Sequence, residues 1–156
     1  MKSREYPERP IVGVGGIAIA ETGDRVLLVR RAHEPLAGEW SIPGGALEVG
    51  ELLTECAARE LLEETGLAVE VLEMVEVFDR VLRAPDGRVQ YHFVLIDYLC
   101  RPRDAGAVPR PGSDSSEARW VARGDLPQYG LRPETLAVIE KAFQRQKQMH
   151  RAQETS

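Results

Sequence analysis

Acidic residues gather in one short stretch of the chain, residues 45–67, which reads GALEVGELLTECAARELLEETGL. Five of its six acidic residues fall on a predicted helix with a single basic residue, Arg59. Because a helix advances about 100° per residue, Glu60, Glu63 and Glu64 fall within an arc of roughly 100° on one face. Carboxylates that converge in this way offer the hard oxygen ligands that Mg²⁺ and Mn²⁺ prefer. We therefore expect metal-assisted chemistry on this face.

A solvated acidic face held by ion pairs would explain the same charges without a ligand. Arg59 lies four residues from both Glu55 and Glu63, a spacing that allows ion pairs on a helix. Like-charge neighbours at this spacing cost only about 0.2–0.5 kcal/mol each, which a stable domain tolerates. The charges alone therefore favour a solvated acidic face over a metal site. Apolar residues on the opposite side are expected to pack against a sheet: Ala58, Leu61 and Leu62.

The wider spacing resembles the Nudix box, G-x5-E-x7-R-E-U-x-E-E-x-G-U, in which U is a bulky aliphatic residue. Every defined position is met without a gap, by Gly45, Glu51, Arg59-Glu60-Leu61, Glu63-Glu64 and Gly66-Leu67. The segments WSIPGG at 40–45 and EARWV at 117–121 also resemble family sequence, so the resemblance covers most of the chain. It implies an α/β fold, the Nudix fold, in which an α/β/α sandwich surrounds a mixed β-sheet.

The resemblance also implies roles for residues in and before the box. Glu60 and Glu64 would be metal ligands, and Glu63 would be a ligand or hold the attacking water. The carbonyl of Gly44 would complete the metal shell, and Arg59 would pair with Glu51 to orient the carboxylates. The implied cofactor is Mg²⁺, with Mn²⁺ as a substitute.

The general base and the substrate contacts are less firmly indicated. A box glutamate or an acid in a later loop could be the base, and Asp114 and Glu117 are the loop candidates; exposed loop acids without a role are an equal alternative. Arg30 and Arg31, at the end of a predicted strand, are candidates for phosphate contacts, although one of them could simply be solvated. Aromatic residues that could stack a base are Trp40, Phe78, Tyr91 and Phe93, but strand aromatics are more often core. We treat His33 and His92 as ordinary residues.

Apolar runs predict the elements that position these residues. Residues 11–20 and 25–31 read as strands of a hairpin, and 40–42 as a possible short strand. Residues 69–84 and 88–100 read as an antiparallel pair joined by Pro85-Asp86-Gly87. A short strand at 118–121 and a helix at 133–149 complete the order β-β-loop-α-β-β-loop-β-α. The glycines at 13–16 match a dinucleotide motif only formally, because the chain continues there as strand.

Composition bounds the class of protein. With 156 residues, 43% hydrophobic and 29% charged, the chain predicts one domain over residues 1–148 and a disordered tail over 149–156. The net charge of −5 gives no basic face for nucleic acid. No segment reaches transmembrane length, no signal peptide is evident, and the two cysteines, Cys56 and Cys100, lack a disulfide or metal pattern. We expect a cytoplasmic protein with reduced core cysteines, and a homodimer remains open.

The function that follows is Mg²⁺-dependent hydrolysis of the pyrophosphate bond in a nucleoside diphosphate linked to another group, with ADP-ribose or a nucleotide sugar as the first substrate to test. A MutT-like nucleoside triphosphate pyrophosphohydrolase is the alternative enzyme. A catalytically silent, nucleotide-sensing module is a further alternative, which the intact box disfavours. A prenyl diphosphate isomerase on the same fold would need a catalytic cysteine, whereas Cys56 sits inside the box helix.

Overall fold

The computed structural model describes residues 4–155, and residues 1–3 and 156 lie outside that description. One sheet has the strand order β4-β1-β6-β5, and the second has the order β3-β2-β7. In the first sheet β1 runs parallel to β6 and antiparallel to β4, so the predicted mixed sheet is confirmed. The strands are β1 (Ile11–Ala18), β2 (Arg25–Arg31), β3 (Trp40–Ser41), β4 (Gly44–Ala46), β5 (Val69–Arg83), β6 (Val89–Pro102) and β7 (Ser115–Ala122). The helices are α1 (Leu53–Thr65), the 3-10 helix η1 (Arg123–Tyr129) and α2 (Pro133–Glu154).

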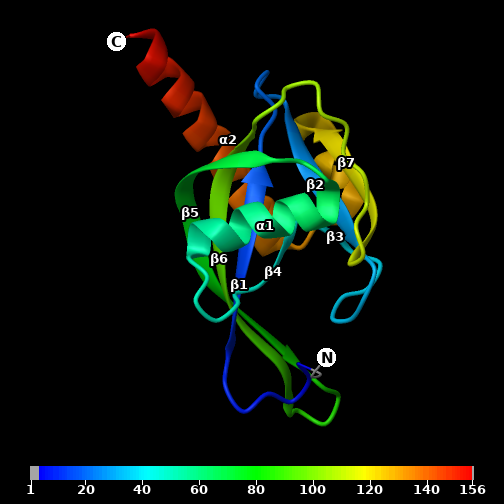
Figure 1. The fold of residues 1–156 in the computed structure, drawn as a ribbon. Coiled ribbons are helices and arrows are strands. Elements are labelled where there is room, and N and C mark those ends of the chain that lie inside the picture. The colour runs from blue at the N-terminus through cyan, green and yellow to red at the C-terminus, as the bar shows by residue number, and fades with distance from the viewer. Residues whose placement is uncertain (1–3, 156) are drawn as a thin grey trace.

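Two hydrophobic cores lie on opposite faces of the sheets. In β1, Val14 and Ala18 belong to the core beneath α1, whereas Ile17 belongs to the core beneath α2. This alternation follows from the period of two along a strand. Helix α1 covers one face and α2 lies behind the other (Figure 1). The arrangement is the predicted α/β/α sandwich.

The predicted hairpin between the first two strands is wrong. Strand β1 has β4 and β6 on its two edges, and β2 has β3 and β7 on its own. Only a single bridge, between Ile19 and Val26, joins the two segments. Both strands are buried on both faces, so each is central in its sheet and needs a partner along each edge. The two sheets diverge from this bridge.

The predicted pair of strands around the Asp-Gly turn is confirmed. Strands β5 and β6 are antiparallel, Gly87 has a φ of 90°, and the Ala84 N–H donates to the Arg88 carbonyl oxygen at 2.9 Å. Their turn end, residues 77–94, projects from the body beside the N-terminal segment (Figure 1) and is called the hairpin arm below. The Tyr6 N–H donates to the Gln90 carbonyl oxygen at 2.7 Å, so the N-terminal segment covers the β6 side of the arm.

Helix α2 is longer than its sequence pattern indicated. Residues 149–154 are helical, so the predicted disordered tail is wrong for them, and residue 156 lies outside the described residues. No glycine or proline interrupts the chain after Pro133, which occupies the first helical turn, and Met149 packs against the core beneath α2. No helix within residues 4–155 is both long enough and apolar enough to span a membrane.

Candidate metal and substrate site

Helix α1 is anchored to the sheet through a narrow apolar stripe. Leu61 is fully buried, whereas Leu62 is 53% exposed, so the prediction that Leu62 packs against the sheet is wrong. The two residues are adjacent and point about 100° apart, and only one of them can face the core. A Cβ at Gly16 would lie 3.2 Å from Leu61 Cγ, so the glycine allows this close approach of helix and strand.

Arg59 holds the carboxylates of the box together. Its guanidinium donates to Glu51 through Nε at 2.6 Å and through Nη2 at 3.0 Å, which confirms the predicted pairing as a contact. The same side chain donates to Glu60 at 2.9 Å, to Glu63 at 3.2 Å and to the Ala46 carbonyl oxygen at 3.2 Å. The hydrogen bonds from Arg59 lower the pKa of the Glu51 carboxyl to about 2. Arg59 is thus a brace that fixes the positions of three carboxylates.

Glu60, Glu63 and Glu64 differ in environment. Glu60 and Glu64 are each only 7% exposed, whereas the Glu63 side chain is 53% exposed. Burial, together with the charge of Glu60, raises the pKa of Glu64 to about 8. Burial also raises the pKa of Glu60, against the opposing charge of Arg59. Two buried carboxylates that repel each other form the inner part of the face.

The glycines before the helix let β4 approach both β1 and the carboxylates. The Gly44 N–H donates to Glu64 Oε2 at 2.8 Å. A Cβ at Gly44 would lie 2.7 Å from the Val14 carbonyl oxygen, and one at Gly45 would lie 2.6 Å from Glu60 Oε2. Neither position has room for a side chain. The role of the Gly44 carbonyl as a metal ligand remains a prediction.

The donor set suits a hard divalent cation that is completed by other ligands. Among residues 4–155, no three His, Cys, Asp or Glu side chains converge closely enough to enclose a metal ion. Glu60 and Glu64 nevertheless supply carboxylate oxygens in a buried setting, where a cation would relieve their repulsion. Mg²⁺ keeps waters and binds substrate phosphates beside one or two carboxylates. The residues fit half of such a site.

A loop brings Asp114 to the carboxylates and leaves Glu117 elsewhere. The Gly112 N–H and the Ser115 hydroxyl both donate to the Glu64 carbonyl oxygen, at 3.1 and 2.8 Å, and so fix this loop to the end of α1. Asp114 lies between these two tied residues, directly before Ser115, and its charge adds to the burial that raises the pKa of Glu64. Glu117 instead accepts from Arg119 at 3.0 Å, on the face covered by α2. Of the two loop candidates, only Asp114 adjoins the face.

The two candidate arginines also separate. Burial lowers the pKa of Arg31, and the charge of the nearby Glu64 carboxylate opposes this shift. The Arg31 Nε donates to the Pro35 carbonyl oxygen at 2.7 Å. Arg30 instead donates to the Gly38 carbonyl oxygen at 3.0 Å and lies 3.6 Å from Glu117. Arg31 is therefore the arginine beside the carboxylates.

Two of the four aromatic candidates, Trp40 and Phe78, pack against the core beneath α2, and the other two lie in the hairpin arm. Tyr91 and Phe93 stack at 6.2 Å between ring centroids, and Tyr91 is 7% exposed. Trp40 meets Tyr129 edge to face at 5.0 Å, and both pack against the core beneath α2, as does Phe78. Packing in the core accounts for Trp40 and Phe78, as aromatic residues in strands usually do.

Comparisons with known proteins identify the family of this chain. The family model described as NUDIX domain matches residues 9–143. The chain belongs to the Nudix family. It is 32% identical over 122 residues to a protein named ADP-ribose pyrophosphatase from Methanocaldococcus jannaschii, with 78% of this chain and 68% of that protein covered. It is 35% identical over 115 residues to a MutT-like protein from Streptomyces ambofaciens, with 74% and 66% covered.

A solved structure of a Nudix hydrolase has a similar fold. The crystal structure of a MutT NUDIX hydrolase from Burkholderia pseudomallei aligns with a TM-score of 0.70 at 32% identity, covering 86% of this chain and 98% of that one. The Nudix resemblance and the α/β fold are confirmed. The chain is a Nudix hydrolase that acts on phosphoric anhydride bonds.

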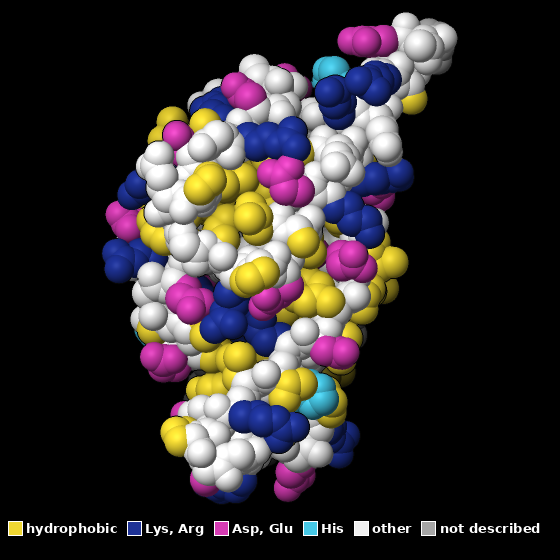
Figure 2. Space-filling model, turned by 180° about the vertical axis from the view of Figure 1, so that it is seen from behind, with side chains coloured by type: hydrophobic (Ala, Val, Ile, Leu, Met, Phe, Trp, Pro, Cys, Tyr) yellow, Lys and Arg dark blue, Asp and Glu magenta, His cyan; other side chains and the backbone are white. Residues whose placement is uncertain are grey.

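Two polar residues outside the Nudix box were missed in the sequence. Asp97 is 5% exposed within the apolar strand β6, and burial raises its pKa to about 7 against the nearby charge of Arg80. Arg80 donates to Glu134 at 3.2 Å and to the Thr135 hydroxyl at 3.4 Å, while its buried Nε has no hydrogen-bond partner among the described residues. A lone acid in the run FVLIDYLC was the signal that could have identified Asp97. Basic and acidic side chains gather above the hairpin arm in Figure 2.

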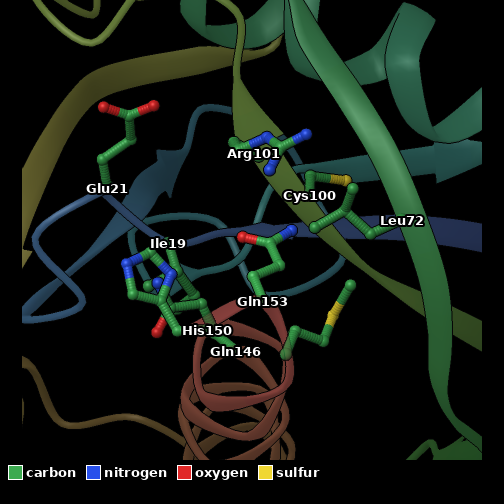
Figure 3. Close-up of a pocket in the computed structure, with 9 residues that line it drawn as sticks. Ile19, Glu21, Leu72, Cys100, Arg101, Gln146, His150 and Gln153 are labelled. Carbon is green, nitrogen blue, oxygen red and sulfur yellow. The ribbon is translucent and has the colours of Figure 1, made fainter. Parts of the chain in front are cut away.

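Two cavities lie outside the Nudix box. One of about 160 Å³ lies between α2 and strands β5 and β6, where Gln146, His150 and Gln153 project from the helix (Figure 3). None of the predicted site residues lines it. The other, of about 400 Å³, lies between residues 34–36 and the hairpin arm, and Tyr91 is part of its wall. Pro35 also lines it and accepts the hydrogen bond from Arg31, so this second cavity adjoins the carboxylate site.

Neither thiol is a candidate for catalysis, although Cys100 lines the cavity of about 160 Å³. Cys56 and Cys100 are free and fully buried, as expected of core cysteines. Burial raises the pKa of each thiol to about 12. A thiol that stays protonated is a poor nucleophile. The isomerase alternative, which needs a catalytic cysteine, therefore has no support.

Proposed function

We propose that this Nudix hydrolase cleaves the pyrophosphate bond of a nucleoside diphosphate linked to another group, with Mg²⁺ as cofactor. The carrying observation is the buried pair Glu60 and Glu64, each of which has a raised pKa. Two adjacent buried carboxylates are costly without a cation and become favourable ligands with one. Mn²⁺, which accepts similar oxygen ligands, should substitute.

The residues around Glu60 and Glu64 would orient the carboxylates, accept a proton and contact the substrate phosphate. A bound Mg²⁺ would neutralise diphosphate charge and lower the pKa of water. Arg59 keeps Glu60 and Glu63 oriented through its hydrogen bonds. Asp114 would accept the proton of the attacking water at its carboxylate, and Arg31 would contact a phosphate oxygen. Asp114 is preferred to Glu117 because only Asp114 adjoins the carboxylates.

The cavity beside Arg31 is our candidate for the part of the substrate beyond the diphosphate. Its volume of about 400 Å³ lies in the range of small-molecule sites. Tyr91 in its wall offers an aromatic edge to a nucleoside or a sugar. The relative named ADP-ribose pyrophosphatase supports a linked diphosphate. The MutT-like relative supports the second candidate, hydrolysis of a nucleoside triphosphate.

The test is product release with Mg²⁺ from ADP-ribose, nucleotide sugars, nucleoside triphosphates and dinucleoside polyphosphates. We expect turnover of the linked diphosphates, and the Glu64→Gln variant should lose metal-dependent turnover while it keeps the wild-type circular dichroism spectrum. Glu55→Gln, on the exposed side of the same helix, is the matched control. Preference for triphosphates would select the MutT-like alternative. No turnover of any substrate would favour a nucleotide-sensing module instead.

A second pair of variants tests the general base. Asp114→Asn should lower kcat by about 10²–10⁴-fold, the usual contribution of a general base. Glu117→Gln, in the same segment but paired with Arg119, should leave kcat close to that of the wild type. Equal effects of the two substitutions would exclude Asp114 from this role.

A further inference from the structure

Strand β5 forms one of the two outer edges of the larger sheet, and the short strand β4 forms the other. Strand β5 is the last in the order β4-β1-β6-β5, and within residues 4–155 no strand pairs with its outer side. Such an edge presents unpaired N–H and C=O groups that can pair with another chain. Natural proteins usually protect long edges with bulges, charges or covering elements.

The half of β5 over the body has such protection. Its register with β6 shifts twice, between Val71 and Glu73 and between Met74 and Glu76. Helix α2 also reaches this half, through Arg145 to Glu73 at 2.6 Å and Lys141 to Glu76 at 3.2 Å. Irregular pairing and charged contacts both disfavour addition of a strand here.

The half of β5 in the hairpin arm has less of this protection. From Val77 to Leu82 the register with β6 is continuous, and the one shift in the arm falls between Leu82 and Arg83, where β6 carries the extra residue. Val77 and Val81 are 47% and 43% exposed, and they alternate with Asp79 and Arg83, which are also exposed. These four side chains share one face of the strand, because side chains alternate along β structure. The N-terminal segment covers the other edge of the arm, so β5 is the side open to a partner.

The exposed side chains of this stretch are complementary to themselves. In an antiparallel pair of two β5 strands with the two-fold axis at Val81, each Val81 faces its counterpart and Asp79 faces Arg83 of the partner subunit. Directly opposed residues lie on the same face of a sheet, where opposite charges stabilise the pair. An axis at Asp79 would oppose two aspartates, and an axis at Arg80 would oppose Asp79 to valine. The charges thus select one register.

We propose that two copies of this chain associate through the outer edges of β5, with antiparallel pairing around Val81. The contact is isologous, so it closes at the dimer and leaves no unpaired β5 edge in the hairpin arm for further growth. The pairing joins the two hairpin arms into one four-stranded antiparallel sheet, β6-β5-β5-β6. Val81, Leu82 and Arg83 also line the cavity of about 400 Å³, so the interface runs along the wall of that cavity.

Sedimentation equilibrium from micromolar to hundreds of micromolar protein tests the proposal. We expect a reversible monomer–dimer equilibrium in the wild type. Asp79→Arg should raise the dimer Kd at least about tenfold, because it opposes two like charges twice per interface. The double variant Asp79→Arg/Arg83→Asp should restore association, since it exchanges the charges. Asp125→Arg, an exposed aspartate in η1, is the matched control and should leave the Kd unchanged.

Folding is checked independently by circular dichroism, and Val81→Lys provides a second disruption at the two-fold axis. Wild-type protein that is monomeric at every concentration would overturn the proposal. A dimer that tolerates both Asp79→Arg and Val81→Lys would also overturn it, because association would then use another surface. Failure of the double variant to regain association would exclude the register centred on Val81.

Discussion

Asp97 gives the protein a predictable dependence of stability on pH. Its pKa is raised from the ordinary value of 3.8 to about 7 by burial. The folded protein therefore holds a proton that the unfolded chain releases between these pH values, and the free energy of unfolding should fall as the pH rises. At about 1.4 kcal/mol per pKa unit, ionising Asp97 in the folded protein costs about 4 kcal/mol once the pH exceeds about 7.

The substitution Asp97→Asn keeps the shape of the side chain and removes the charge. We expect the variant to be more stable than the wild type by up to about 4 kcal/mol at about pH 8, and by little at about pH 4, where Asp97 is protonated in both states. Urea denaturation of both proteins across this range measures the difference, in which the other titrating groups cancel. Asp125→Asn, exposed in η1, is the control.

A difference that does not grow with pH would refute the argument. It would mean that Asp97 is ionised in the folded protein at neutral pH, with its charge balanced by Arg80, the nearby cation. Lower stability of the asparagine variant at about pH 8 would lead to the same conclusion, because a paired carboxylate would have been lost.

Two further substitutions test the site and its anchor. Gly45→Ala places a methyl group against the Glu60 carboxylate and should weaken Mn²⁺ binding by about 10–100-fold in calorimetry, with the fold retained; unchanged affinity would separate Glu60 from the metal. Leu61→Ala should lower the free energy of unfolding by about 2–5 kcal/mol, whereas its exposed neighbour Leu62→Ala should change it by less than about 0.5 kcal/mol. Similar losses of unfolding free energy in the two variants, measured by urea denaturation, would contradict the conclusion that only a narrow apolar stripe of α1 faces the sheet.

The features that the sequence predicted well depend on local signals. The Asp86-Gly87 turn specifies its own hairpin, and the spacing from Glu51 to Glu64 specifies a helix face and its brace. Gly66, within the box, ends the helix in a left-handed conformation with a φ of 75°, the usual conformation of a glycine directly after the last helical residue. Each of these signals depends on residues that are close together in the chain, so the sequence alone is enough to recognise it.

The features that the sequence did not predict depend on contacts between distant segments. Whether β1 pairs with β2 is decided by β6 and β7, which lie far along the chain. The separation of Asp114 from Glu117 depends on hydrogen bonds from the loop to the end of α1 and on the contact of Glu117 with Arg119. Periodicity carries no information on such pairings. Leu62 was misplaced because two adjacent leucines leave the direction of the stripe open.

The ties between the 110–115 loop and the end of α1 have a consequence for how this protein could diversify. Asp114 travels with the helix that carries Glu60 and Glu64, because Ser115 and Gly112 hold the loop to the Glu64 carbonyl oxygen. The hairpin arm and residues 34–36, which border the cavity, make none of those contacts. Insertions or substitutions in the arm should therefore change which substrates bind in the cavity, while the positions of Glu60, Glu64 and Asp114 stay the same. A few substitutions in the arm should be enough to change the substrate specificity.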